Sequence, residues 1–355
     1  MKTSTSKRLR WNVAIWLAAG LFMTSTAGMA SGPIMPDPKA EARHQPQVEE
    51  TANGIPLVNI TAPSSGGVSR NEYETFNVPD KGAILNNSYT LSKTELAGYV
   101  QGNNNMAERP AKIIVNEVTG TGSTSMDGFL EVAGNRADVV IANPNGITVN
   151  GGGFINTGKA FLTTGKPVYD GEDHLQRFDI TGGDILIEGK GLGGKEAGSL
   201  AILSRAVRIN AGIWAKDLHI TTGANTVDAK TLEASAIEGK GERPAFALDT
   251  AAIGGMYAGR ITLVGTEKGL GVNNSGTWSA EDNLTLDWNG DLKNSGTIYS
   301  KGNADLRASH LENDKTIAAE RNLSAAAKEN IRNQGKLLAG ENMDIYAGKT
   351  LDNAG

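Results

Sequence analysis

The chain has 355 residues, a formal net charge of −5 and no cysteine. The missing thiols exclude disulfide cross-links and cysteine catalysis, and the acidic balance argues against nucleic acid as a partner. Glycine is abundant, at 45 residues, while aromatic residues make up only 5% of the chain. Because glycine favours turns over the interiors of helices and strands, this composition predicts short elements joined by frequent turns.

The first thirty residues have the pattern of an export signal. A basic start, with lysine or arginine at positions 2, 7, 8 and 10, precedes an apolar core over 13–23, and the alanines at 27 and 30 offer cleavage sites. The core is too short to anchor the chain in a bilayer. We therefore expect residues 1–30 to be a cleaved signal peptide and the product to be soluble or attached to a surface.

Residues 31–52 have a different composition. Prolines at 33, 36, 38 and 46 alternate with charged residues, and there is almost nothing to bury. Such a segment cannot offset the entropy of ordering its backbone. We expect a disordered linker between the signal and the folded domain.

From residue 53 to about 270 the sequence is a series of short β-prone runs. Branched residues dominate runs such as 113–115, 185–187 and 261–264, and glycine, asparagine, aspartate or serine separates them. Helical periodicity is nearly absent. Short, evenly spaced runs fit either a β-sandwich or a β-solenoid.

A repeat near the C-terminus decides between these two folds. Five similar segments begin at Val272, Leu292, Leu311, Ile331 and Leu351, at spacings of 20, 19, 20 and 20 residues. A fixed period of this length is typical of a solenoid, in which no single repeat buries its own core. With one repeat per coil, equivalent asparagines lie ~4.8 Å apart and can hydrogen-bond in a ladder. The ladder would contain Asn274, Asn294, Asn313, Asn333 and Asn353.

The stretch 141–157, IANPNGITVNGGGFINT, places dense turn signals between apolar runs. Pro144 biases Asn143 away from the helical region, and Asn145-Gly146 favours positive φ. A hydrogen bond from either asparagine to the backbone would contribute about 1 kcal/mol. We expect a tight turn between two strands, followed by a glycine run at 151–153 that another strand can approach closely.

Seven segments, in this order, resemble the secretion domain of the two-partner secretion exoproteins of the filamentous haemagglutinin type. They are GIPLVNITAP (54–63), GVSRNEYETFNV (67–78), GAILNNS (82–88), LAGYVQGN (96–103), IIVNEVTG (113–120), EVAGNRADVVIANPNGI (131–147) and NGGGFINT (150–157). The resemblance implies a right-handed parallel β-helix with an N-terminal cap over 53–270. The repeats would then fill 271–355 and continue in a longer parent protein.

The same resemblance implies a function. Family members are recognised by an outer-membrane partner transporter, through its periplasmic domains, and nucleate β-helix folding during export. The resemblance assigns a recognition turn to Asn143, Pro144, Asn145, Gly146 and Ile147, with secondary candidates at Asn103, Asn104, Asn105, Met106, Asn116 and Glu117. The chain would be the N-terminal part of a large secreted adhesin or haemagglutinin at the surface of a diderm bacterium. Later parts of the parent would bind a host-cell or neighbouring-cell receptor or glycan.

Two positions depart from the family pattern. A second Asn-Pro motif of the family, NPNL, is Asn103-Asn104-Asn105-Met106 here, so that turn lacks its proline. Some members, mostly haemolysins and growth-inhibition toxins, have a cysteine pair where this chain has Val149 and Gly152. This difference favours an adhesin, and the front end of a contact-dependent growth inhibition toxin is the alternative.

Other motifs are only weak evidence for catalysis or for ligand binding. Residues 189–195 fit the dinucleotide pattern GxGxxG, but Glu196 replaces the Ser or Thr of a phosphate loop, and a strand is predicted where a helix is needed. A β-helical polysaccharide-active enzyme would need a carboxylate cluster, and a solvated loop accounts better for the acidic residues at 170, 172, 173 and 179. The four histidines are scattered. We therefore expect no catalytic residue, metal or cofactor.

Overall fold

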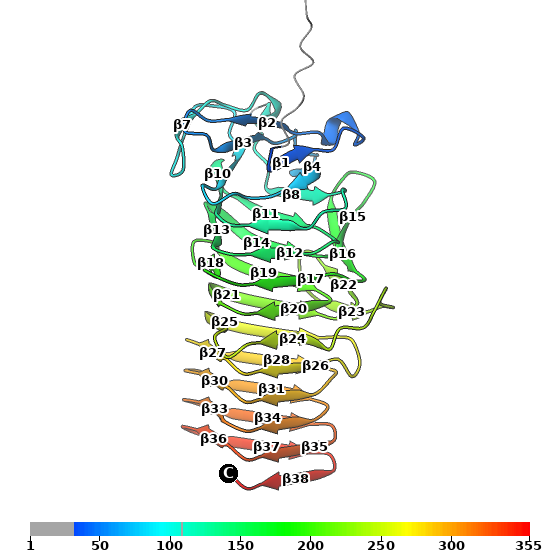
Figure 1. Ribbon diagram of the computed structural model, residues 1–355, viewed down its shortest axis with the longest axis vertical. Helices are drawn as coiled ribbons and strands as arrows, with labels where there is room; N and C mark the ends of the chain where they lie inside the picture. Colours follow the sequence, from blue (N-terminus) through cyan, green and yellow to red (C-terminus); the bar gives the residue numbers. More distant parts are fainter. Residues whose placement is uncertain (1–31, 108) are drawn as a thin grey trace, which may run out of the picture. The chain divides into compact units, whose positions relative to one another are not determined.

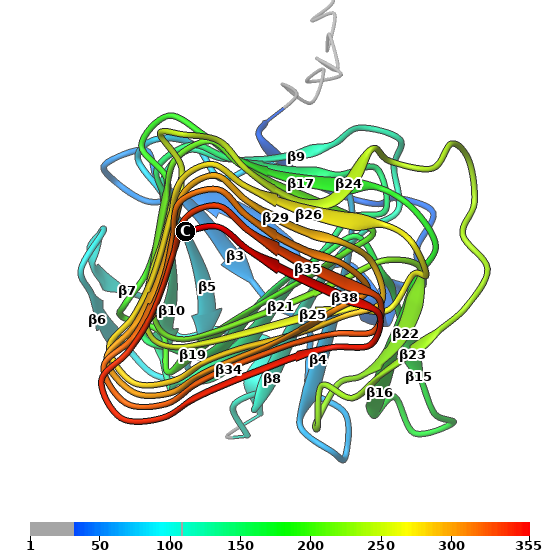
Figure 2. The same ribbon diagram turned by 90° about the horizontal axis from the view of Figure 1, so that it is seen from below.

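The computed structural model describes residues 32–107 and 109–355, and residues 33–355 form one compact unit (Figure 1). This unit is a parallel β-helix in which three short strands make each coil. Seen along the stack, the coils have a roughly triangular outline (Figure 2). The predicted fold class is confirmed. Among the described residues no helix is long and apolar enough to cross a membrane, and the predicted signal peptide over 1–30 lies outside them.

Three faces run the length of this unit. The first face is a parallel sheet of ten strands in the described part of the chain: β9 (Thr124–Met126), β12 (Ile147–Val149), β17 (Asp184–Ile187), β20 (Ala206–Ile209), β24 (Phe246–Thr250), β26 (Gly271–Asn274), β29 (Leu292–Asn294), β32 (Leu311–Asn313), β35 (Asn330–Asn333) and β38 (Thr350–Asn353).

The second and third faces are joined because two long strands, β21 (Gly212–Thr222) and β25 (Gly255–Gly265), run through both. The second face also contains β3 (Pro56–Asn59), β5 (Ala83–Asn87), β10 (Phe129–Gly134), β13 (Gly152–Ile155), β18 (Leu192–Gly194), β27 (Thr277–Ala280), β30 (Thr297–Ser300), β33 (Thr316–Ala319) and β36 (Lys336–Ala339). The third face contains β4 (Val68–Phe76), β8 (Ile113–Val118), β11 (Ala137–Ala142), β14 (Thr157–Thr163), β19 (Ser199–Ser204), β28 (Leu284–Trp288), β31 (Ala304–Ala308), β34 (Leu323–Ala327) and β37 (Met343–Ala347).

Alternation of apolar and polar residues explains these strands. In β28, Leu284, Leu286 and Trp288 are buried inside the coil, while Thr285 and Asp287 are not. Successive side chains of a strand point to opposite faces, so this period of two fills the interior. Leu286 pairs with Leu306 of β31 in the next coil, and the buried residues form one continuous core along the stack. Each repeat therefore depends on its neighbours for burial.

Several elements lie outside the coils. A hairpin of β6 (Ser92–Thr94) and β7 (Gly98–Val100) follows β5, and the 3-10 turn η2 (Asn104–Met106) precedes β8. A four-stranded antiparallel sheet combines β15 (Lys166–Tyr169), β16 (Leu175–Ile180), β22 (Asn225–Asp228) and β23 (Ala234–Ala236). Phe178 of β16 and Val227 of β22 are buried against the third face, with Phe161 and Leu203. This external sheet thus has its own small apolar core.

The N-terminal segment closes the first coil. β1 (Ile34–Pro36) pairs antiparallel with β4, and β2 (Gln47–Glu50) pairs antiparallel with β3, with the 3-10 turn η1 (Ala42–His44) between them. The prediction of a disordered linker over 31–52 is therefore wrong for the described residues 32–52. The segment is ordered because two exposed strand edges supply its backbone hydrogen bonds, and because Ile34 and Pro46 are buried and Val48 packs against the core.

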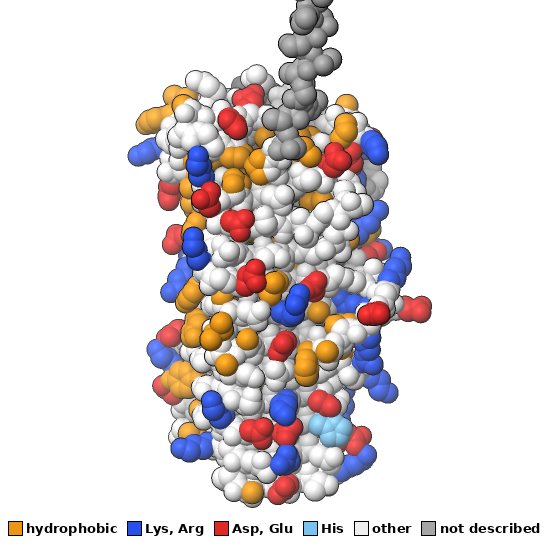
Figure 3. All heavy atoms as spheres, in the orientation of Figure 1, with side chains coloured by type: hydrophobic (Ala, Val, Ile, Leu, Met, Phe, Trp, Pro, Cys, Tyr) orange, Lys and Arg blue, Asp and Glu red, His pale blue; other side chains and the backbone are white. Residues whose placement is uncertain are grey.

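The predicted asparagine ladder is present. Side-chain amides join Asn274 to Asn294 at 2.8 Å and Asn294 to Asn313 at 2.7 Å. The bonds from Asn313 to Asn333 and from Asn333 to Asn353 are both 2.6 Å. The first four asparagines are buried. On the outer surface, basic and acidic side chains are interspersed (Figure 3), and some pair between coils, as Arg332 does with Glu312.

Candidate recognition turn

The turn at 143–146 joins β11 of the third face to β12 of the first face. The N–H of Gly146 donates to the carbonyl of Asn143 at 3.1 Å, which closes the turn. Gly146 has a φ of +110°, and a Cβ at this position would lie 3.0 Å from the carbonyl oxygen of Asp184 in the next coil. Both the conformation and the close approach therefore require glycine here.

Asn143 is the buried centre of the turn. It has no exposed surface, and its Nδ2 donates to the carbonyl of Gly122 and to Oγ1 of Thr124, both at 3.0 Å. Its Oδ1 accepts from the backbone N–H of Asn145 at 2.9 Å. The side chain thus binds the turn to the preceding coil, and both of its polar atoms are engaged within the protein.

The other residues of the motif differ in their exposure to solvent. Ile147 is buried in the core as the first residue of β12. Pro144 and Asn145 are exposed, although Asn145 still donates through Nδ2 to the carbonyl of Gly120 at 2.9 Å. Of the five predicted recognition residues, only Pro144 and Asn145 offer a side chain to solvent in the folded domain.

The secondary motif forms the same local structure without its proline. Asn103 is buried, and its Oδ1 accepts from the N–H of Asn105 at 2.9 Å, as Asn143 does from Asn145. Its Nδ2 donates to the carbonyls of Ile60 and Asn86, both at 2.9 Å. Met106 is buried, and Asn104 is exposed. Side-chain hydrogen bonds thus hold this turn where the family's proline is missing.

The two turns occupy different corners of the coil. The turn at Asn103 lies between the second and third faces, whereas the turn at Asn143 lies between the third and first faces. Asn116 of β8 belongs to the strand beside β11, where it pairs with Ile141 and accepts from the hydroxyl of Tyr73 at 3.0 Å. The predicted residues therefore form two separate groups.

Glu117 has a role that its sequence neighbours did not indicate. It is 5% exposed, and its Oε2 lies 3.4 Å from Nη2 of Arg70. Burial raises the pKa of the Glu117 carboxyl, and Arg70 opposes that rise. Glu117 is thus part of a buried charged cluster in the folded domain.

The sequence and the fold are similar to those of known proteins. Residues 33–298 match the TPS secretion domain family, and residues 299–355 match the haemagglutinin repeat. The chain belongs to the TPS secretion domain family. Its structure is also similar to the crystal structure of the filamentous hemagglutinin secretion domain, with a TM-score of 0.66 and 30% identity, over 91% of this chain and 100% of that one.

Longer curated proteins share this domain. "Toxin CdiA" of Yersinia pestis is 42% identical over 297 residues, and "16S rRNA endonuclease CdiA" of Enterobacter cloacae is 40% identical over 347 residues. The alignments cover 77% and 91% of this chain but 9% and 10% of those relatives. This chain therefore spans about a tenth of their length.

Family membership carries a function. A TPS secretion domain is recognised by an outer-membrane partner transporter, and the chain is the secretion-recognition domain of an exported protein of Gram-negative bacteria. The fold and the family are those of a secretion domain, not of an enzyme. The glycine motif at 189–195 agrees with this reading, because it forms a bend with Gly189 and Gly191 at positive φ, contains β18, and is followed by β19 rather than by a helix.

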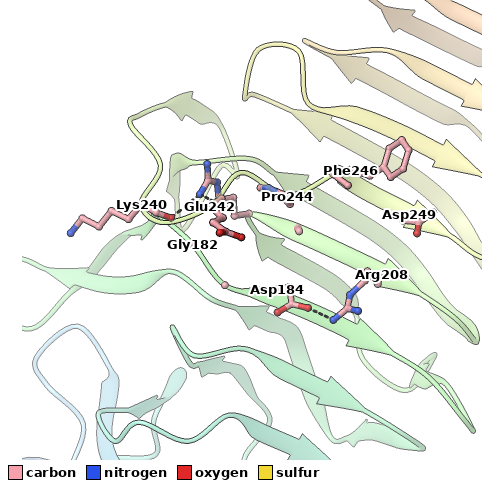
Figure 4. A pocket seen from close by; sticks show the side chains of 12 residues that line it. Gly182, Asp184, Arg208, Lys240, Glu242, Pro244, Phe246 and Asp249 are labelled. Carbon is pink, nitrogen blue, oxygen red and sulfur yellow. Dashed lines mark hydrogen bonds and ion pairs between the residues drawn. The ribbon is translucent and has the colours of Figure 1, made fainter.

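A cavity of about 340 Å³ lies one coil beyond the turn. Its wall at Gly183 adjoins the turn, since a Cβ there would lie 2.8 Å from the carbonyl oxygen of Pro144. Figure 4 shows Asp184 and Arg208 paired on one side, opposite the segment that carries Lys240, Glu242 and Pro244. Sequence reasoning missed this cavity because the two walls are far apart in the chain.

One buried arginine supports the far wall of this cavity. Arg205 pairs with Glu267 through two hydrogen bonds of 3.0 Å, and it donates to the carbonyl of Lys240 at 2.7 Å. The hydrogen bonds from Arg205 lower the pKa of the Glu267 carboxyl. An ion pair this well bonded offsets its own desolvation, so Arg205 fixes the path of residues 239–245 rather than binding a ligand.

Proposed function

We propose that the periplasmic domains of the partner transporter bind the recognition turn at 143–147 before the domain has folded. One observation supports this order of events. Asn143, Gly146 and Ile147 are buried in the folded domain, and both polar atoms of the Asn143 side chain already have partners. A transporter that contacts these side chains must therefore bind the chain in an extended, unfolded form.

Folding would then follow export through the outer membrane. β1 and β2 pair with the first parallel strands and satisfy edges that would otherwise pair with another chain. Each coil that emerges adds its strands to the coil before it, and the free energy of this stacking draws the chain outward. The domain thus acts first as an unfolded signal and afterwards as the folding nucleus of the β-helix.

Binding of two forms of the same sequence tests the order of events. Purified periplasmic domains of the partner transporter would be titrated with a peptide of residues 138–157 and with folded residues 33–355. We expect the peptide to bind, the Asn143→Ala peptide to bind at least about tenfold more weakly, a loss of about 1.4 kcal/mol, and the folded domain not to bind. Equal binding of the folded domain and the peptide, or no binding by either, would overturn the proposal.

For the parent protein we propose a large secreted adhesin or haemagglutinin that binds a receptor or glycan on a host or neighbouring cell through its later parts. The haemagglutinin repeat over 299–355 supports this reading. The names of the relatives favour a second candidate, a toxin that inhibits neighbouring cells on contact. Mixed cultures of producing and target cells separate the two, because attachment without killing supports adhesion, whereas killing that requires contact supports the toxin.

A further inference from the structure

Three segments that are distant in the sequence meet in a charged cluster at the N-terminal end of the β-helix. η1 supplies Arg43 and His44, β4 supplies Arg70 and Glu72, and the loop between β15 and β16 supplies Asp173. Nη1 of Arg43 lies 3.0 Å from Oδ2 of Asp173, across 130 residues of sequence. This ion pair joins residues 33–52, here called the N-terminal cap, to the external sheet.

His44 extends the cluster inward. Its Nδ1 lies 3.0 Å from Oε1 of Glu72, and its Nε2 lies 4.0 Å from Oδ2 of Asp173. Nη2 of Arg70 is 2.9 Å from the same oxygen of Glu72. The His44 side chain is only 6% exposed and that of Glu72 only 12%. The contact between His44 and Glu72 is therefore screened far less than the ion pair of Arg43 with Asp173, in which the arginine side chain is 63% exposed.

The loop that carries Asp173 is shaped for this contact. Asp173 has a φ of +57°, which L-residues rarely adopt, and its carbonyl accepts from Oγ of Ser64 at 3.4 Å. Arg70 lies over the ring of Tyr169, 4.4 Å from its centroid. The prediction of a merely solvated acidic loop is thus too simple, since Asp173 is drawn onto the cap while Asp179 stays on the outside with Arg177.

The cap has few other attachments. β1 pairs with β4 over three residues and β2 pairs with β3 over four, and β2 is largely exposed. Short edge strands of this kind open locally at low cost in free energy. The charged cluster lies at η1, between β1 and β2, so a contact there restrains the segment that connects the two strands.

We propose that Arg43, His44, Glu72 and Asp173 form a clamp that holds the N-terminal cap closed over the edges of β3 and β4. The clamp closes only when the loop between β15 and β16 is in place. Pairing of β1 and β2 with the first strands alone therefore leaves the cap free to open locally, and the clamp holds it closed once the chain has folded past residue 173. This device is independent of how the transporter reads the turn at 143–147.

Charge-removing variants of residues 33–355 test the clamp. Asp173→Asn removes the charge but keeps a side chain that tolerates positive φ. Asp179→Asn is the matched control, because it makes the same change in the same hairpin, at an arginine pair of similar exposure that does not contact the cap. Hydrogen exchange followed by mass spectrometry would compare peptides from 33–52 with peptides from the repeats at 271–355.

We expect Asp173→Asn to speed exchange of the cap by about two- to fivefold, as the loss of a partly exposed ion pair implies, and to leave the repeats unchanged. Asp179→Asn should change neither region. Arg43→Gln should reproduce the effect, and the double variant should exchange no faster than either single variant. Unchanged exchange of the cap in Asp173→Asn, or equal acceleration of cap and repeats, would overturn the clamp.

Discussion

Asn294 donates from Nδ2 to Oδ1 of Asn313 at 2.7 Å, and its own Oδ1 accepts from Nδ2 of Asn274 at 2.8 Å. Asn294, Asn313 and Asn333 thus each take part in two rungs of the ladder, and Asn274, at its start, takes part in one. A second row, Asn303, Asn322 and Asn342, makes similar bonds of 2.9 Å at an exposed corner. The two rows allow the same chemistry to be compared inside and outside the protein.

The buried row should contribute far more to stability. Asn294→Ala breaks two rungs and leaves buried polar atoms without partners, so we expect a loss of about 2 to 4 kcal/mol in the free energy of unfolding. Asn322→Ala breaks matching bonds where water can replace them, and we expect a loss below about 1 kcal/mol. Urea unfolding of both variants measures the difference. Equal losses would contradict the assigned role of burial.

His219 should make stability depend on pH. Burial, followed by the nearby charge of Lys159, lowers the pKa of His219 from 6.5 to about 4. The unfolded chain therefore takes up this proton more readily, and the contribution of neutral His219 is complete above pH 6.5 and is lost as the pH falls toward 4. The loss is on the order of 3 kcal/mol, at 1.36 kcal/mol per pKa unit.

A single substitution isolates this effect. His219→Gln does not titrate in this range and can keep the hydrogen bond to Oγ1 of Thr221, which is 2.8 Å long. We expect its stability to fall less than that of the wild type between pH 7 and pH 4.5, as measured by urea unfolding. Parallel pH profiles for the two proteins would show that His219 is not protected from protonation.

Gly146 should be intolerant of a side chain for purely structural reasons. Alanine would have to adopt a φ of +110° and place its Cβ 3.0 Å from the carbonyl oxygen of Asp184. Strain of this kind costs about 1 to 3 kcal/mol. Gly171 is the control, because a Cβ there would meet no atom within 4 Å among the described residues. Thermal melting should show a clear loss for Gly146→Ala and almost none for Gly171→Ala.

The repeats were predictable from the sequence alone because their regular spacing can be counted along the chain. The positions of Asn274 and Asn294 follow from a twenty-residue period, and coils stacked at this period place the two residues side by side on neighbouring strands. The turn at 143–146 was predictable for a similar reason, since Pro144 and Gly146 act on their own backbone. Local chemistry and fixed periods are the features that a sequence shows directly.

Contacts between distant segments were not predictable. The burial of Asn143 depends on Gly122 and Thr124, about one coil earlier. The order of residues 32–52 depends on strands β3 and β4, whose free edges do not show in the composition of the segment itself. The pairing of Arg43 with Asp173 was unpredictable for the same reason, because the two residues are distant in the sequence.

We propose that the transporter recognises the turn at 143–147, and the burial of Asn143 complicates the test of this recognition. From the sequence, loss of one hydrogen bond would cost about 1 kcal/mol. In the structure Asn143 makes several such bonds without exposed surface, so Asn143→Ala should destabilise the domain by about 2 to 4 kcal/mol. A loss of export could then reflect poor folding alone.

Asn225 provides the matched control. It is fully buried outside the seven family segments, and its Nδ2 donates to the carbonyls of Thr222 and Gly223 and to Oγ1 of Thr266 at 2.9 to 3.1 Å. Asn225→Ala should therefore lower the melting temperature about as much as Asn143→Ala does. Only Asn143 belongs to the predicted recognition turn.

The most direct test is the fraction of each variant that the partner transporter secretes, measured beside thermal melting of the same purified domains. The account predicts similar melting temperatures for Asn143→Ala and Asn225→Ala, with export of Asn143→Ala reduced sharply and export of Asn225→Ala close to that of the wild type. Equal export of the two variants would contradict recognition of the turn.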